Sequence, residues 1–136
     1  MTAVEIAIER WKREELDLRP PLEESVIEAR LSVLGRPYSR DVVVLYKLTG
    51  GMGDNVSDSL LWSLWSLDRV VEETRRYSRP CILFADFLIE SQFYCFKYEN
   101  EDRSSIAIEY LTGEEPEVIA GSVEEFFERL NSQLAF

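Results

Sequence analysis

Residues 81–111 read CILFADFLIESQFYCFKYENEDRSSIAIEYL and carry the pattern of three successive β-strands. CILFADFL is a continuous apolar run, as in a central strand. In QFYCFKY and SSIAIEYL the side chains fall alternately into two sets, one for each face of a strand. Asn100-Glu101-Asp102 supplies a turn between the last two runs. Short strands joined by turns are typical of an antiparallel meander. The segment therefore predicts the centre of an antiparallel sheet, which EVIA at 117–120 extends after the turn at 112–116.

Helical patterns flank these strands on both sides. Val4, Ile8 and Trp11 fall on one stripe of a helix expected within residues 1–19, which Pro20-Pro21 would end. Pro21 suits the first turn of a second helix that would end at Gly35. Its expected apolar stripe consists of Leu22, Val26, Ala29 and Val33, and the face is widened by Ile27, Leu31 and Leu34.

Two further helices are expected later in the chain. Ser66 can cap a short helix that ends near Arg75-Arg76. At the C-terminal end, Ser122 and Glu125 match the S-x-x-E capping box. The expected buried stripe of this last helix consists of Val123, Phe126, Phe127, Leu130 and Leu134.

Residues 42–48, VVVLYKL, fit two structures. The β-branched run favours a strand. Val42, Leu45, Tyr46 and Thr49 nevertheless follow the i, i+3, i+4, i+7 spacing of a helix, and Gly50-Gly51 would end that helix.

The order of the elements predicts an α+β fold. We expect an antiparallel sheet of roughly four to six strands, with N-terminal helices and a closing C-terminal helix packed against it. Residues 1–136 are expected to form a single domain, to which the helix in residues 1–19 could be an appendage.

Composition and charge exclude several classes of function. The chain has no histidine, which excludes serine or cysteine nucleophiles paired with histidine and HExxH zinc sites. The formal net charge of −11 argues against nucleic acid as a ligand. The N-terminus resembles neither a secretory signal nor a transit peptide, and no apolar run could span a bilayer. We therefore expect a cytoplasmic protein with no membrane association.

Few residues suggest catalysis or metal binding. Cys81 and Cys95 lie in apolar runs without further ligands, which indicates buried free thiols more than a disulfide, a reactive thiol or a zinc site. Asp54 and Asp58 in one loop, with Asp86 and Glu90 around one strand end, could serve as paired carboxylates of a small hydrolase. The simpler interpretation is that they form turns and caps. We predict no cofactor, no metal and no catalytic residue.

Three local patterns, in order along residues 22–130, resemble the SUKH superfamily of Smi/Knr-type domains. They are RPYSRDVVVLYKLTGG at 36–51, LWSLWSL at 61–67 and IAGSVEEFFE at 119–128. The resemblance implies a helix at 39–49. It also implies a binding module without catalysis, since many bacterial members of the family are immunity proteins that neutralise toxins, and fungal members are regulators or scaffolds.

The charge distribution suggests where a partner would bind. Residues 101–136 carry nine acidic and two basic side chains, a net charge of −7 out of −11. A basic, nuclease-type toxin would suit such a surface. The residues predicted to bind the partner are Glu114, Glu115 and Glu117, together with Asp54, Asp58, Trp62 and Trp65. The two tryptophans fit either core packing or an aromatic groove, and the groove would suit the alternative of a regulatory adaptor that binds a host protein or peptide.

Overall fold

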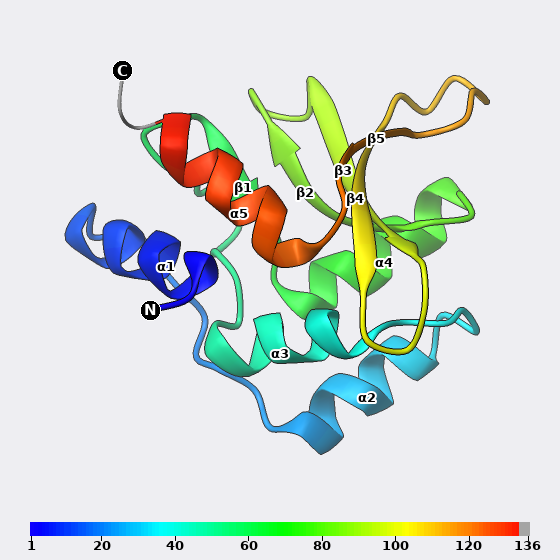
Figure 1. Ribbon diagram of the computed structural model, residues 1–136, viewed down its shortest axis with the longest axis horizontal. Coiled ribbons are helices and arrows are strands. Elements are labelled where there is room, and N and C mark those ends of the chain that lie inside the picture. The colour runs from blue at the N-terminus through cyan, green and yellow to red at the C-terminus, as the bar shows by residue number, and fades with distance from the viewer. Residues whose placement is uncertain (134–136) are drawn as a thin grey trace.

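The predicted meander forms the centre of a five-stranded antiparallel sheet in the computed structural model, which describes residues 1–133 (Figure 1). The strands follow one another in the order in which they occur in the chain. They are β1 (Trp62–Leu64), β2 (Ile82–Phe87), β3 (Gln92–Tyr98), β4 (Ser104–Glu109) and β5 (Glu117–Ala120). The α+β class and the packing of helices against an antiparallel sheet are thereby confirmed.

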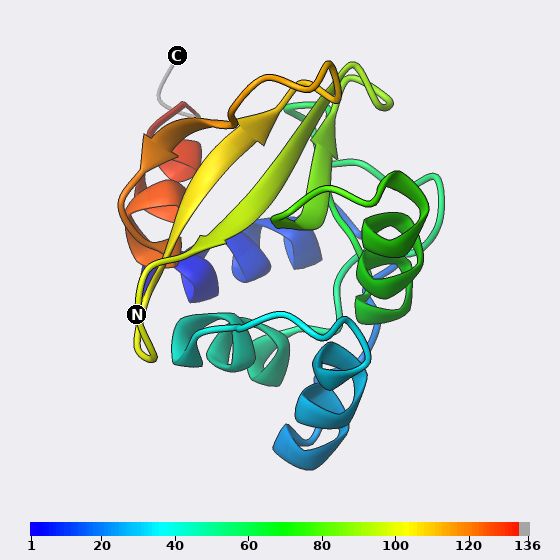
Figure 2. The ribbon, with the colours of Figure 1, turned by 90° about the vertical axis from the view of Figure 1, so that its right-hand side faces the viewer.

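Helices cover both faces of this sheet (Figure 2). They are α1 (Ala3–Arg13), α2 (Glu24–Ser32), α3 (Arg40–Leu48), α4 (Leu67–Tyr77) and α5 (Val123–Ser132). Phe93 and Tyr94 are neighbours in β3, so their side chains point to opposite faces. The ring of Phe93 lies 5.6 Å from that of Tyr77 in α4, and the ring of Tyr94 lies 5.6 Å from that of Phe126 in α5. Helices α4 and α5 therefore sandwich the sheet.

The N-terminal helix belongs to the core, so the prediction of an appendage in residues 1–19 was wrong. Helix α1 ends at Arg13, and Trp11 is fully buried against Trp62 and Phe127. The Glu124 carboxylate accepts a hydrogen bond from the backbone N–H of Ala3 at 2.9 Å. The first helix is thus fixed to the last one by apolar packing and by a cap.

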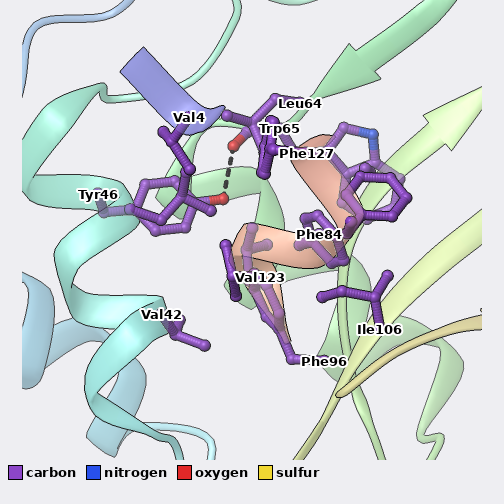
Figure 3. Packing of buried hydrophobic residues seen from close by; sticks show 14 of the residues in the cluster. Val4, Val42, Tyr46, Leu64, Trp65, Phe84, Phe96, Ile106, Val123 and Phe127 are labelled. Atoms are coloured by element: carbon purple, nitrogen blue, oxygen red, sulfur yellow. Dashed lines mark hydrogen bonds between the residues drawn. The ribbon is translucent and has the colours of Figure 1, made fainter. Parts of the chain in front are cut away.

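Residues 40–48 form helix α3, as the SUKH resemblance implies, and the strand alternative fails. Val42, Leu45 and Tyr46 are buried while Val44 is exposed, which is the helical period. The Tyr46 hydroxyl donates to the Trp65 carbonyl at 2.9 Å, and Figure 3 shows this bond inside the apolar core. Gly51 ends the segment with a φ of +92°, and a Cβ atom there would overlap the Trp65 carbonyl.

Helix α2 differs from its prediction in its start, and only residues that widen its predicted apolar face are buried. It begins at Glu24, three residues after Pro21, and buries Ile27 and Leu31. The expected stripe of Val26, Ala29 and Val33 is exposed. The helix packs against α3 and α4 through one narrow face, so that two side chains a turn apart suffice to fill the contact.

The capping box of α5 is formed in part as predicted. The Ser122 hydroxyl accepts from the backbone N–H of Glu125 at 3.0 Å, while the Glu125 carboxylate accepts from Gly121 rather than from Ser122. Val123, Phe126, Phe127 and Leu130 are buried as expected. Leu134 lies outside the described residues.

Candidate functional site

An exposed acidic loop connects β4 to β5 at one end of the sheet. We call residues 110–117 the acidic loop. Glu114, Glu115 and Glu117 are exposed, and within residues 1–133 none of the three forms an ion pair. Tyr110, itself 42% exposed, donates its hydroxyl to the Glu117 carboxylate at 3.0 Å, and this bond raises the pKa of Tyr110. The loop therefore presents unpaired negative charge next to an exposed aromatic ring.

A buried ion pair anchors the acidic loop to the core. The Glu109 carboxylate has no exposed surface and lies 3.0 Å from Nε of Arg79. It also accepts a hydrogen bond from the backbone N–H of Leu111 at 3.0 Å. The same arginine donates through Nη2 to the carbonyl of Glu114 at 2.9 Å. One guanidinium group thus fixes both the start and the middle of the loop.

The acidic residues of segment 101–136 do not form one surface. Glu101 and Asp102 occupy the β3–β4 turn, at the opposite end of the sheet from the acidic loop (Figure 1). Glu124 caps α1, and Glu125 pairs with Arg129 at 2.9 Å. The excess of charge that the sequence places in the last quarter of the chain is therefore distributed over several sites. Among residues 101–133, the acidic loop alone gathers three exposed carboxylates.

The structure separates Asp54 from Asp58 and removes Asp58 from the predicted interface. Asp54 is exposed in the loop before β1, whereas the side chain of Asp58 is completely buried. The Asp58 carboxylate accepts from Nη1 of Arg10 at 2.9 Å and from Nε1 of Trp11 at 3.0 Å. It is a core residue that joins helix α1 to the loop before β1, so its prediction as a partner-binding residue was wrong.

The two tryptophans are core residues and do not form one aromatic wall. Trp62 and Trp65 are 2% and 1% exposed. Three positions apart in extended chain, they lie on opposite faces of the sheet: Trp62 packs 5.5 Å from Phe126 of α5, and Trp65 packs 5.9 Å from Phe93. Both side chains therefore pack in the core, as one of the two alternatives has it, and they do not form a shared wall for a partner.

Trp62 nevertheless borders a groove, which differs from the groove considered in the sequence analysis because Trp65 does not line it. The groove, of about 340 Å³, runs between α5 and the sheet. We call it the α5 groove, and its apolar lining consists of Leu60, Trp62, Phe87, Tyr94, Ile119, Phe126 and Leu130. The pairing of β4 with β5 skips Ile119, since Val118 pairs with Ala107 and Ala120 with Ile106. A β-bulge of this kind changes the direction in which a side chain points, and the sequence EVIA contains no pattern that predicts the bulge.

Asp86 and Glu90 line a second hollow, of about 250 Å³, with Arg69. Nη2 of Arg69 lies 3.2 Å from the Asp86 carboxylate and 3.3 Å from that of Glu90. Burial raises the pKa of Asp86, although hydrogen bonds from Trp65 and Arg69 act in the opposite direction. Neither Asp54 nor Asp58 lines this hollow, so the structure does not bring the two predicted carboxylate pairs together.

Cys81 and Cys95 are free and buried, as predicted. The Cys81 thiol donates to the Glu109 carboxylate at 3.6 Å, and its contact with Cys95, together with burial, raises the pKa of the Cys95 thiol. Within residues 1–133, no three Cys, Asp or Glu side chains are grouped so as to hold a metal ion. No helix in this part of the chain is both long and apolar enough to cross a membrane.

Comparison of the chain with models of known protein families and with curated proteins finds no match. The similarity to the SUKH superfamily therefore stays a prediction from the quoted motifs.

Proposed function

We propose that this protein is a non-enzymatic binding protein that docks a basic protein partner on its acidic loop. The observation that carries the proposal is the loop itself: Glu114, Glu115 and Glu117 are exposed and free of ion pairs within the described residues. Their carboxylates are available to lysine and arginine side chains of a partner, and the field of such a cluster speeds association with a positively charged surface.

The specific form of the proposal is an immunity protein that neutralises a nuclease-type toxin. A nuclease binds phosphate groups in a basic cleft. An anchored loop with three neighbouring carboxylates offers that cleft a surface with the charge of its substrate. The anchoring by Arg79 supports this function, because a loop held in place loses less conformational entropy when it binds.

A charge-reversal experiment with a matched control tests the proposal. Glu114→Lys/Glu115→Lys changes the net charge by the same amount as Glu101→Lys/Asp102→Lys at the opposite end of the sheet. Proteins captured from an extract of the native host are compared among wild type and the two double variants, and the captured partner is then purified for kinetic measurements.

We expect the acidic-loop variant to lose a basic partner that wild type and the control variant both retain. With the purified partner at low salt, the association rate constant should fall about 10-fold to 100-fold in the acidic-loop variant and change little in the control. Equal retention by both variants would contradict docking at the acidic loop.

The adaptor alternative has one supporting observation, the α5 groove beside Trp62. An adaptor that binds mainly through this groove would keep its partner at high salt, whereas the partner of the acidic loop would dissociate.

A further inference from the structure

We infer that the α5 groove receives an apolar side chain of the same basic partner, so that the acidic loop and the groove form one continuous binding surface. This inference rests on the proposed function. It adds the chemistry of the bound segment: a large apolar or aromatic residue flanked by lysine or arginine.

The register of the sheet places the groove next to the acidic loop. Tyr94, Ile108 and Glu117 are direct neighbours across β3, β4 and β5, so they share one face. Tyr94 lines the groove, and Glu117 begins β5 two strands away, which is about 10 Å. Ile119, two residues after Glu117, lines the groove as well. Negative charge therefore stands at the edge of an apolar hollow.

The volume and lining of the groove suit a side chain. Its volume of about 340 Å³ lies at the lower end of ligand pockets, which extend from about 300 to 1,000 Å³. The side chains of Phe87, Tyr94 and Phe126 offer an aromatic surface to a ring. Arg129 also borders the groove, but its charge is paired with Glu125 at 2.9 Å. A large side chain that fills a pocket from which water is excluded is the usual form of a binding hot spot.

The experiment uses two fluorescein-labelled heptapeptides, one with phenylalanine and one with alanine at the centre and both with lysine at all remaining positions. Their affinities for the full chain are measured by fluorescence anisotropy at low salt. We expect the phenylalanine peptide to bind about tenfold more tightly or better, because the ring is removed from water in the groove. Equal affinities, or no binding of the phenylalanine peptide, would overturn the inference.

Two variants separate the groove from the acidic loop. Ile119→Trp fills the groove and should remove the preference for phenylalanine while leaving the alanine peptide unaffected. Glu114→Lys/Glu115→Lys should weaken both peptides by the same factor and keep the preference. If the preference for the phenylalanine peptide persists and the charge reversal has no effect, the proposed function is overturned, while binding in the groove stands. If the charge reversal weakens binding but neither peptide is preferred, binding in the groove is overturned, while the proposed function stands.

A photo-cross-linking measurement covers the case in which Ile119→Trp does not fold. A peptide with benzoylphenylalanine at its centre should form adducts at Leu60, Ile119 or Phe126, and adducts confined to other surfaces would overturn the inference. Two other occupants of the groove are also tested. A preference that appears only in Leu134→Ala/Phe136→Ala would assign the groove to this chain's own C-terminal residues. A preference that appears only when self-association is suppressed by dilution would assign it to a second copy, and either result would overturn the inference.

Discussion

Asp58→Ala should destabilise the fold strongly, because it removes the acceptor of four hydrogen bonds at a position without solvent. The two side-chain donors are Arg10 and Trp11, and the two backbone donors are the N–H groups of Leu60 and Trp62, at 2.9 and 3.1 Å. The side chain of Arg10 is only 8% exposed. The variant would therefore leave this nearly buried guanidinium group with only the more distant and partly exposed Glu14 carboxylate, at 3.4 Å, as its counter-ion.

The magnitude follows from this burial. Breaking a buried ion pair from one side costs about 3–5 kcal/mol, and each buried donor left without an acceptor adds about 1–3 kcal/mol, although such losses do not simply add. We expect a loss of about 4 kcal/mol from a total free energy of unfolding of about 5–15 kcal/mol. With a urea m-value of about 2 kcal/mol/M, the midpoint of unfolding should fall by about 2 M.

Urea unfolding followed by tryptophan fluorescence and by far-UV circular dichroism measures this loss. Asp54→Ala is the matched control, because Asp54 is an exposed aspartate of the same loop and should change the free energy of unfolding by less than about 0.5 kcal/mol. Adding Arg10→Met to Asp58→Ala should restore part of the stability, since the charge that has lost its buried partner is then absent. A loss below about 1 kcal/mol for Asp58→Ala, with no recovery in the double variant, would refute the role of the ion pair.

Three further predictions concern the backbone, a buried acid and the cysteines. Gly51→Ala should lower the free energy of unfolding by more than about 2 kcal/mol, because the added Cβ meets the Trp65 carbonyl. Gly35→Ala meets no neighbouring atom and should lower it by only about 1 kcal/mol, which is the cost of a positive φ for alanine. Urea unfolding measures both values. Burial raises the pKa of Asp86 in the folded state, so its contribution makes the free energy of unfolding fall as the pH rises from about 3.9 through the raised pKa. Asp86→Asn should remove this dependence of the free energy of unfolding on pH. Parallel pH profiles of the wild type and the variant would contradict the prediction. Cys81 and Cys95, which are 7% and 0% exposed, should react with Ellman's reagent no faster than the protein opens, and both should react at once in denaturant; immediate labelling of the native protein would show that the thiols are accessible.

The sequence predicted those helices and strands in which several local features, such as a cap, a turn or an apolar pattern, indicate the same structure. Helix α5 combines a serine cap with an apolar stripe, strand β2 is a continuous apolar run, and strands β3 and β4 alternate on either side of a turn, so each was recognisable without its neighbours. Helix α3 was not decided by propensity, because Val42, Val43 and Val44 favour a strand as isolated residues. Its helical state depends on packing, including the Tyr46 bond to Trp65, which lies 19 residues away.

The candidate site likewise contains features that the sequence predicts and features that it does not. The exposure of Glu114, Glu115 and Glu117 was predictable, because a turn with glycine and proline between two strands lies at the surface. The burial of Asp58 was not, because its partner Arg10 is 48 residues away and nothing in the local sequence indicates it. The α5 groove depends on the β-bulge at Ile119 and on the packing of α5 beside the sheet, both of which are tertiary features.

The contact between the first and last helices also affects how the protein is made. The Glu124 carboxylate that caps α1 follows Ala3 by 121 residues, and Phe127, against which Trp11 packs, lies farther still along the chain. On the ribosome, α1 is complete before the sheet and α5 have been synthesised. A helix of this length is marginal in water by itself, so its apolar face is open to chaperones and to aggregation throughout most of translation. Folding of the nascent chain cannot finish before residues 123–132 have emerged from the ribosome, and the N-terminal helix must be among the last elements to settle.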